Sequence, residues 1–245
     1  MARRFIVNRE DIQYIDDNHM EIFGKEVKHI QVLRHNIGDH IIVNEYDCNI
    51  TNMCSHSVKL QILKETEPIG IPNIDVTLYI GMLKNDKMDF VVQKAVELGV
   101  KNVIPFFSKN VVVKLDNQSR IKRMEKLQVV ANEACKQCGR TDLVKVCEFE
   151  EFNKMLESIK HFDSTIIAYE NDKTSLKETI QNMKDSKIVK NIAIIIGAEG
   201  GFDKTEVEKM LENDNIYIVS LGTRILRAET AALNLLSIVM YELDS

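Results

Sequence analysis

The spacing of hydrophobic residues divides the chain into two parts. Up to about residue 70, short β-branched runs alternate with polar residues and turn signals, which predicts strands at 3–7, 40–46 and 57–63. One short helix is predicted at 26–34. Pro68-Ile-Gly-Ile-Pro72 then places two prolines and a glycine within five residues, as linkers do. The pattern predicts a small β-barrel over residues 1–72.

Beyond the linker, strand and helix patterns alternate. The predicted strands are 76–81, 102–107, 144–147, 165–169, 192–196 and 216–221. The predicted helices are 86–98, 119–136, 150–158, 175–183 and a long apolar one from 228 onward. Residues 164–168 and 192–196 lack polar alternation, which is typical of central strands. Residues 73–245 are therefore predicted to form an α/β domain with a mainly parallel sheet covered by helices.

Two predicted helices show which side chains they bury. In the helix at 86, Asp86 is the expected cap, and the apolar face comprises Met88, Val91, Val92, Ala95 and Leu98. In the helix at 119, packing is assigned to Ile121, Met124, Leu127, Val130 and Ala134, which turns Arg120, Arg123 and Lys126 outward. Gly139 is predicted to end that helix and Arg140 to lie in the loop beyond it.

Composition places the chain among globular proteins. Of its 245 residues 44% are hydrophobic, yet no apolar run approaches the length that spans a bilayer. The start, Met-Ala-Arg-Arg-Phe, lacks the apolar region of a signal peptide, so a cytoplasmic location is expected. Five cysteines without an export signal favour free thiols. Cys135 and Cys138 have metal or redox spacing, but no second such pair exists, and no metal site is expected.

Charge is unevenly distributed along an acidic chain. The formal net charge is −5, but residues 101–145 hold ten Lys and Arg against four Asp and Glu. Residues 146–245 hold eleven basic against eighteen acidic residues. A basic patch can bind phosphates even on an acidic protein. The same composition also suits an ordinary solvated helix face, and the sequence leaves both interpretations open.

Two glycine turns at strand ends are the strongest chemical signal. The strand at 192–196 runs into Gly-Ala-Glu-Gly-Gly-Phe202, and the strand at 216–221 runs into Gly-Thr-Arg-Ile-Leu-Arg-Ala-Glu229. Ligands of open α/β sheets bind at the carboxyl ends of strands, and glycine lets a backbone approach them closely. Each turn taken singly also suits a plain loop. Neither turn is part of a GxGxxG or GxxxxGK[ST] phosphate motif.

Four stretches together resemble the RsmE family of SPOUT-class RNA methyltransferases. They are 88–100 (MDFVVQKAVELGV), 131–140 (ANEACKQCGR), 197–202 (GAEGGF) and 221–233 (LGTRILRAETAAL). The family usually has Pro where Ala198 stands and Ser where Cys138 stands. The resemblance implies a PUA-like RNA-binding barrel followed by a SPOUT domain with a C-terminal trefoil knot. It also implies a homodimer that uses S-adenosylmethionine to methylate N3 of a uridine in the decoding region of 16S ribosomal RNA.

The resemblance also assigns roles to residues. The cofactor-binding set it implies is Tyr169, Glu170, Ile196, Gly197, Gly200, Gly201, Leu221, Gly222, Ile225, Leu226 and Ala231. The RNA contacts it implies are Arg3, Arg4, Arg9, Arg34 and Arg140, the last of which is also a candidate for positioning substrate or reaching a partner subunit.

Methylation of N3 requires loss of its proton, so the site must stabilise an anion. Arg227 and Arg224 are suited to charge on O2 and O4, and Glu199 or Glu229 is suited to accept the proton or orient an arginine. The sequence does not choose between the two carboxylates. Glu229 also suits the first turn of a helix for purely structural reasons.

Three other functions compete with this assignment. A non-catalytic RNA-binding protein is disfavoured by the intact glycine turns. A nicotinamide-dependent oxidoreductase lacks its GxGxxG motif. A methyltransferase of the same fold acting on another ribosomal or transfer RNA is the serious rival, because cofactor loops identify the class better than the base.

Overall fold

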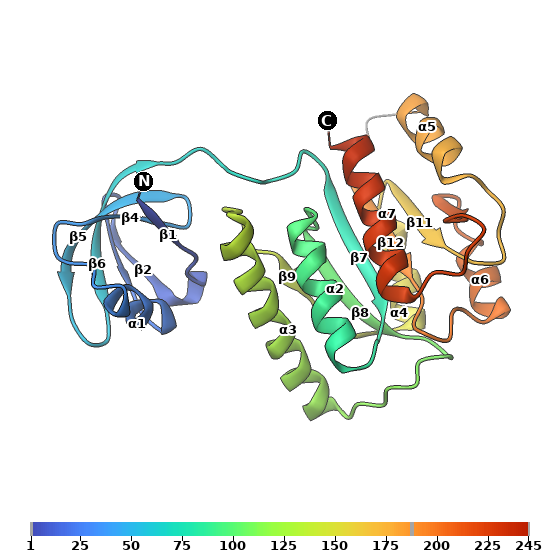
Figure 1. The fold of residues 1–245 in the computed structure, drawn as a ribbon, viewed down its shortest axis with the longest axis horizontal. Helices are drawn as coiled ribbons and strands as arrows, with labels where there is room; N and C mark the ends of the chain where they lie inside the picture. Colours follow the sequence, from blue (N-terminus) through green and yellow to red (C-terminus); the bar gives the residue numbers. More distant parts are fainter. Residues whose placement is uncertain (1, 187–188, 245) are drawn as a thin grey trace. The chain divides into compact units, whose positions relative to one another are not determined.

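The computed structural model describes residues 2–186 and 189–244 (Figure 1). The chain forms two compact units, residues 1–71 with 135–143, and residues 72–134 with 144–245. The change of unit at residue 72 follows the proline-containing linker. The segment 135–143 groups with the first unit by its contacts, which the linear order of the sequence does not indicate.

The first unit is built on a six-stranded mixed sheet. Its strands are β1 (Arg3–Phe5), β2 (Ile12–Asp16), β3 (His19–Ile22), β4 (His40–Val43), β5 (Tyr46–Met53) and β6 (Val58–Glu65). They are ordered β1-β4-β5-β6-β3-β2, and only β1 and β4 pair in parallel. Helix α1 (Lys25–Val32) and a 3₁₀ turn (Arg9–Asp11) complete the unit. The predicted β-rich N-terminal part is therefore confirmed.

Two features of this unit differ from the predicted strands: a chain reversal within residues 40–46 and an additional hairpin. The strand predicted at 40–46 is two strands, because the chain reverses at Asn44, which has φ 51°, and Val43 pairs with Tyr46. The Asn44 side chain stabilises the reversal by accepting from the Val7 amide and donating to the Val7 carbonyl. The hairpin of β2 and β3 was not predicted, since β2 is largely exposed and carries little hydrophobic signal.

The second unit contains a parallel sheet of seven strands. They are β7 (Asp75–Gly81), β8 (Asn102–Phe107), β9 (Lys145–Val146), β10 (Glu150–Glu151), β11 (Ser164–Ala168), β12 (Asn191–Ile196) and β13 (Ile216–Val219). The order is β10-β8-β7-β12-β11-β13, with β9 also paired to β8. Strands β11 and β12 lie inside the sheet and are buried along most of their length, as their unbroken apolar runs predict.

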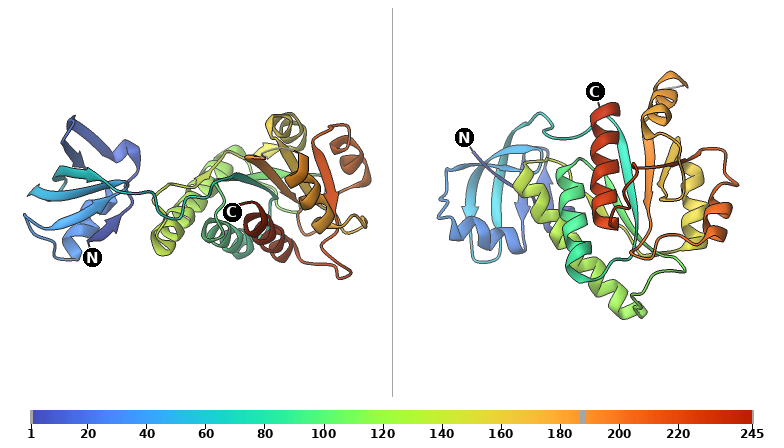
Figure 2. Two further views of the ribbon diagram at one scale, coloured as in Figure 1. Left: turned by 90° about the horizontal axis from the view of Figure 1, so that it is seen from above. Right: turned by 45° about the vertical axis from the view of Figure 1, so that its right-hand side comes forward.

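Helices cover both faces of this sheet (Figure 2). They are α2 (Asn85–Glu97), α3 (Asn117–Cys138), α4 (Phe152–Ser158), α5 (Leu176–Ser186), α6 (Lys204–Met210) and α7 (Ala228–Leu243). On one face α2 and α7 pack against each other, and α7 contacts β7 and β12. On the other face Met155 of α4 and Met210 of α6 join a core with Tyr79 and Ile195 of the sheet. Alternate residues of each strand therefore pack into two separate cores, one on each face of the sheet.

The predicted helix faces are right for α2 and partly wrong for α3. Met88 and Val92 of α2 are buried, but the helix begins at Asn85 after Lys84, so Asp86 lies in the first turn and is not the cap. In α3, Ile121 is 56% exposed, whereas the Arg123 side chain is 14% exposed. Arg123 and its neighbour Lys126 contact Asp89 of α2 at 2.7 and 2.8 Å, so this part of α3 packs through ion pairs. Helix α6 and its N-terminal cap were not predicted at all.

The C-terminal segment returns from the edge of the sheet to its centre. β13 lies at one end of the strand order, while α7 after it packs on α2 and β12. On the way, residues 225–228 pass beside residues 196–202, and both line one cavity. A knotted arrangement requires such a crossing, but the threading itself stays a prediction. Within the described residues, no helix has the length and apolar character needed to cross a membrane.

Candidate active site

A cavity of about 530 Å³ lies at the carboxyl ends of β11 and β12. It is formed by the turn after β12, the loop before α7 and the start of α2. The residues predicted from sequence that line it are Glu170, Ile196, Gly197, Glu199, Gly201, Ile225, Leu226, Arg227 and Ala231. Lys87, Ala168, Ala198, Phe202 and Ala228 complete the lining. The fold therefore brings the two glycine-containing loops together, as the sheet rule predicts.

The turn after β12 is packed so closely that side chains would not fit at several points. A Cβ on Gly201, which has φ +64°, would lie 2.9 Å from Oε1 of Glu170. A Cβ on Gly81, at the end of β7, would lie 2.4 Å from the Ala198 amide nitrogen. The Gly201 amide donates to the Ala198 carbonyl at 2.9 Å, which closes the turn. Close backbone approach is thus the physical reason for glycine here.

Residues after β8 hold this turn from the side. Asn110 Nδ2 donates to the carbonyls of Gly200 and Gly201 at 3.1 and 3.4 Å. A Cβ on Gly200 would lie 2.9 Å from the Asn110 carbonyl oxygen, so Gly200 supports the turn and does not line the cavity. Sequence reasoning missed Asn110, because one asparagine in a loop carries no pattern.

The exit of the turn is fixed by the cap of α6. Asp203 and Glu206 form a capping box, in which the Asp203 carboxylate accepts from the Thr205 amide at 3.0 Å. Lys109 Nζ donates to Asp203 at 3.0 Å, and the Lys109 amide donates to Glu206 at 2.9 Å. Hydrogen bonds from Thr205 and then from Lys109 lower the pKa of Asp203 to about 2. The spacing Asp203 to Glu206 is a sequence signature of this cap that the pattern analysis overlooked.

The loop before α7 is far more exposed than the turn after β12. Ile225 is 86% exposed, and Arg224 and Arg227 are also exposed, with no ion pair or hydrogen bond of their guanidinium groups among the described contacts. Arg227 is the residue that precedes α7, and Ala231 in the next turn is buried. Of these two cations, Arg227 lines the cavity and Arg224 does not.

A second cavity adjoins the first and shares Glu170 with it. Its volume is about 1170 Å³, and it is lined by residues 170–177, 220–223 and parts of α5 and α7. Leu221 and Gly222, both predicted to bind cofactor, line this cavity and not the smaller one. Tyr169 lines neither cavity, since its ring packs against the core and its hydroxyl accepts from Asn171 Nδ2 at 3.2 Å.

A charged cluster borders the smaller cavity. Lys87 Nζ lies 3.5 Å from Oε1 of Glu199 and 3.7 Å from Oε2 of Glu229. These side chains come from α2, from the turn after β12 and from the first turn of α7. Lys87 was not predicted as a functional residue, because a lysine in the first turn of a surface helix looks like ordinary solvated charge. Its partners stand 112 and 142 positions away in the chain.

The N-terminal arginines lie in the first unit. Arg3, Arg9 and Arg34 are exposed, as a phosphate contact requires. Arg4 is half-buried, and its guanidinium donates to the carbonyl of Asn44. Arg4 therefore braces the reversal between β4 and β5, and burial lowers its pKa.

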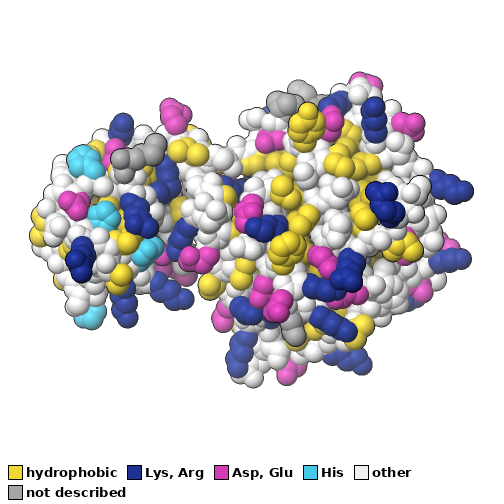
Figure 3. Space-filling model, in the orientation of Figure 1, with side chains coloured by type: hydrophobic (Ala, Val, Ile, Leu, Met, Phe, Trp, Pro, Cys, Tyr) yellow, Lys and Arg dark blue, Asp and Glu magenta, His cyan; other side chains and the backbone are white. Residues whose placement is uncertain are grey.

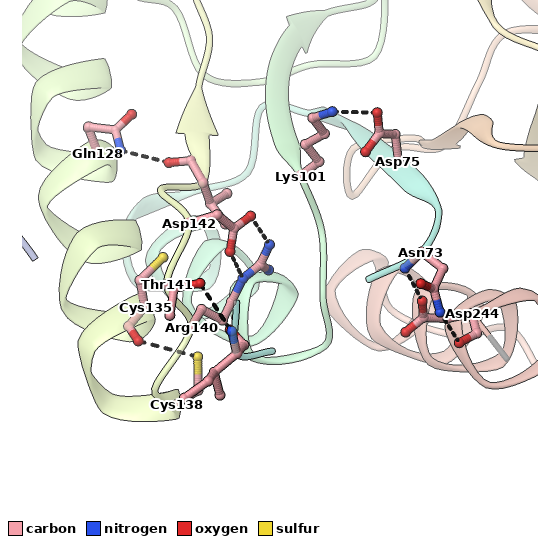
Figure 4. Close-up of polar contacts among 12 residues, drawn as sticks. Asn73, Asp75, Lys101, Gln128, Cys135, Cys138, Arg140, Thr141, Asp142 and Asp244 are labelled. Carbon is pink, nitrogen blue, oxygen red and sulfur yellow. Dashed lines mark hydrogen bonds and ion pairs between the residues drawn. The ribbon is translucent and has the colours of Figure 1, made fainter. Parts of the chain in front are cut away.

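Arg140 is buried instead of lying on an open loop. Its side chain is 3% exposed, and Nε and Nη2 donate to the two carboxylate oxygens of Asp142 at 2.9 and 2.7 Å. Figure 4 shows the guanidinium turned toward this carboxylate. The neighbouring Thr141 amide donates to the carbonyl of Ile69 at 3.1 Å. The predicted place of Arg140 in the loop after α3 is confirmed, but its side chain is part of the framework of the first unit. Its contact with RNA stays a prediction.

The cysteines form no centre of their own. All five are free thiols, and burial raises the pKa of Cys48 to about 12. Cys138 lies at the end of α3, where its Sγ contacts the carbonyl of Cys135. Among the described residues, no group of three or more His, Cys, Asp or Glu side chains is arranged to hold a metal ion.

Comparison with known proteins adds to this geometry. A family model described as an RNA methyltransferase domain matches residues 71–240. The ribosomal RNA small subunit methyltransferase E of Bacillus subtilis is 31% identical, with 99% of this chain and 97% of that protein covered. The protein of the same name from Mesomycoplasma hyopneumoniae is 31% identical, with 96% and 97% covered. A crystal structure of that methyltransferase from Neisseria gonorrhoeae, bound to S-adenosyl methionine, is 25% identical with a TM-score of 0.80 and 98% of each chain covered.

Proposed function

The chain belongs to the ribosomal RNA small subunit methyltransferase E family, and on this premise we propose that it methylates N3 of a uridine in the decoding region of 16S ribosomal RNA. It is an S-adenosylmethionine-dependent RNA methyltransferase by family. The observation that carries the proposal is the convergence of two glycine-containing loops and a charged cluster on one cavity at the carboxyl edge of the sheet.

The residues around the smaller cavity fit S-adenosylmethionine. Its volume of about 530 Å³ lies within the range of about 300–1,000 Å³ usual for small-molecule sites. Ile196, Leu226 and Ala231 offer apolar surface, and Gly197 and Gly201 bring the backbone of the turn to the cavity wall. The carboxylate of Glu170 suits a ligand that carries a positive sulfonium. Leu221 and Gly222 extend the proposed site into the adjoining cavity.

The remaining charged side chains suit the acceptor base. When bound, S-adenosylmethionine supplies an electrophilic methyl group whose sulfur leaves as a neutral thioether. The protein must remove the N3 proton of uracil and stabilise the resulting negative charge. Glu199 or Glu229 is the proposed proton acceptor, and Arg227 or Lys87 is the proposed cation near the developing charge.

The first unit is proposed to bind RNA. We assign residues 1–72 to a PUA-like RNA-binding domain and residues 73–245 to the methyltransferase domain. Exposed Arg3, Arg9 and Arg34 support phosphate binding. An enzyme that modifies the small ribosomal subunit is expected to work in the cytoplasm.

The proposed homodimer would use the outer face of α7. Tyr241 is 83% exposed and Phe90 of α2 is 44% exposed. Phe90 lines a cavity together with Leu98, Leu233 and Ile238, among others. Figure 3 shows hydrophobic side chains on this face, over α2 and α7. Exposed apolar side chains gathered along two packed helices support a protein contact.

The test uses small ribosomal subunits from cells that lack the endogenous enzyme. Purified protein is incubated with them and tritiated S-adenosylmethionine, and the labelled nucleoside is identified by mass spectrometry after digestion. Label on 3-methyluridine is the expected result. Label on another nucleoside, or on another RNA only, would overturn the proposed substrate while keeping the methyltransferase assignment.

A further inference from the structure

We propose that Glu199 and Lys87 together engage the imide edge of the uracil, and that Glu229 is a positioning residue that acts through Lys87. This inference rests on the proposed function and divides the charged cluster into three roles. Glu199 accepts the N3 proton, Lys87 donates a hydrogen bond to the adjacent carbonyl oxygen, and Glu229 holds the Lys87 ammonium in place.

The position of each side chain relative to the cavity supports this division. Lys87 and Glu199 line the cavity, whereas Glu229 does not. Glu229 lies in the first turn of α7, where its side chain is 16% exposed, against 25% for Glu199 and 37% for Lys87. Oε2 of Glu229 is buried and accepts no hydrogen bond among the described residues. Glu229 instead lines a separate cavity with Phe90 and Leu233, so Lys87 is the group that links it to the smaller cavity.

The buried oxygen of Glu229 nevertheless has a charge partner. Lys87 Nζ at 3.7 Å is the cation with which it forms an ion pair. A carboxylate taken out of water is costly unless a nearby cation offsets its charge. Glu229 thus draws the Lys87 ammonium toward α7, and the ammonium in turn stays beside Glu199. Removing Glu229 would leave Lys87 with Glu199 as its only carboxylate partner among the described contacts, so the ammonium would be held less firmly.

Lys87 keeps its hydrogen-bond donors available. Its distances of 3.5 and 3.7 Å to the two carboxylates are those of ion pairs, and no hydrogen bond of the ammonium occurs among the described contacts. The Glu199 carboxylate also has acceptor capacity left. Among the described contacts, its Oε1 accepts one long hydrogen bond, from the Lys84 amide at 3.4 Å. One donor and one acceptor therefore lie side by side at the cavity wall.

This pair matches the edge of a uracil. In the imide of uracil, the N3–H donor lies directly beside a carbonyl acceptor. The N3–H can therefore donate to the Glu199 carboxylate while the carbonyl oxygen accepts from the Lys87 ammonium. The N3–H bond breaks with its electron pair left on nitrogen, and the proton passes to Glu199. The nitrogen pair then forms the N–CH₃ bond as the C–S bond breaks and its electrons stay on sulfur. Lys87 stabilises the charge that spreads to the carbonyl oxygen meanwhile.

Arg227 is left without this role. It is exposed, and no described contact fixes its guanidinium. Stabilisation of a developing charge requires donors that are already in place. Arg227 is better suited to a phosphate at the mouth of the cavity, where a mobile cation binds as well as a fixed one.

The test compares E199Q, K87M, E229Q and the double variant K87M/E229Q, with K94M as the control. Lys94 also lies on α2 and pairs with a carboxylate, Glu97, at 2.8 Å, but it lines no part of the cavity. Affinity for S-adenosylmethionine is measured by calorimetry, and methyl transfer to small subunits under saturating conditions gives kcat. We expect every variant to bind the cofactor as the wild type does, and K94M to keep its kcat.

The expected losses differ by role. E199Q loses about 10²-fold or more in kcat, as removal of a general base does. Its rate recovers relative to the wild type as pH rises, because the imide ionises in water without help. K87M loses about 10²-fold, as removal of one anion-stabilising donor does. E229Q loses less of its kcat than K87M does. The kcat of K87M/E229Q equals that of K87M, because Glu229 acts only through the Lys87 ammonium, which K87M has already removed.

Three results would overturn the inference. Wild-type kcat in E199Q or K87M would remove them from the chemistry. Multiplicative losses in K87M/E229Q would mean that Glu229 acts on the substrate directly. Weakened cofactor binding that accounts for the whole loss would reduce the cluster to a structural role. These differ from failure of the proposed function, in which the wild-type protein itself would leave no label on N3 of uridine.

Discussion

Replacement of Gly81 by alanine tests whether the close approach of β7 to the turn after β12 sets the shape of the cavity. A Cβ at this position would lie 2.4 Å from the Ala198 nitrogen and 3.0 Å from its Cα and Cβ. Gly81 is not among the glycines with positive φ, so alanine suits the strand backbone itself. The whole effect must therefore come from contact with the turn. Backbone atoms cannot rotate away as a flexible side chain can.

The geometry gives the size of the effect. Restoring a van der Waals separation of about 3.5 Å requires the turn to retreat by about 1 Å. Overpacking of this kind costs about 1–3 kcal/mol of folding free energy. Ile196, Gly197 and Gly201 line the cavity, so they move with the turn. A displacement of about 1 Å at a reacting site lowers kcat/KM by about 10²-fold. We expect the Kd for S-adenosylmethionine to rise at least about tenfold, or 1.4 kcal/mol.

The assay pairs calorimetric titration of S-adenosylmethionine with thermal unfolding. Gly38→Ala is the matched control, because Gly38 has φ +95°, lies in the first unit and has no heavy atom within 4 Å of its ideal Cβ. That variant should lose about 1–2 kcal/mol of stability from backbone strain and keep its cofactor affinity. If Gly81→Ala unfolds at a lower temperature yet binds cofactor like the wild type, the turn does not set the cavity and the reasoning fails.

Three further predictions concern other parts of the molecule. Arg140→Ala should destabilise the protein by about 2 kcal/mol, because it leaves the Asp142 carboxylate without its buried partner; a normal unfolding midpoint with weakened RNA binding would restore the RNA-contact interpretation. Asp203→Ala should lower the unfolding midpoint at neutral pH. Because the folded pKa of Asp203 is depressed to about 2 from 3.8, its contribution is present above pH 3.8 and is lost as pH falls toward 2. The difference from the wild type should therefore shrink over that range, and a constant difference in unfolding midpoints would contradict it. Tyr241→Glu should shift sedimentation toward monomer, since the ring is 83% exposed on the proposed dimer face; an unchanged oligomeric state would exclude that face.

The division of roles among the charged residues has a consequence for engineering. We expect cofactor affinity to depend mainly on the glycine turns, whereas the proposed chemistry depends on a cluster that joins α2, the turn after β12 and α7. Variants of Lys87 or Glu229 should therefore separate binding from turnover. A protein that holds cofactor and RNA but transfers slowly would be useful for capturing the complex with the small subunit.

Much of the fold follows from local patterns. Unbroken apolar runs identified β11 and β12, and the alternation of strands with helices identified the parallel sheet. The turns at Asn44 and the hairpin of β2 and β3 were missed, because side-chain hydrogen bonds and exposed strands leave little trace in hydrophobicity. The packing face of α3 was misassigned at Ile121 and Arg123. Arg123 is mostly buried where it pairs with Asp89, whereas Lys126, which pairs with the same carboxylate, is 60% exposed, as predicted.

The sequence by itself determined the class of fold, the two glycine-containing loops and the family. Those features depend on residues that are neighbours in the chain. The period of the hydrophobic residues and the spacing of the motifs are therefore enough to predict them. Only the tertiary structure brought Lys87 to Glu199 and Glu229, set Gly81 against Ala198 and buried Arg140. These contacts join segments far apart in sequence, and strand register and helix packing decide them. A polar residue at such a point resembles any other solvated residue until the fold supplies its partner.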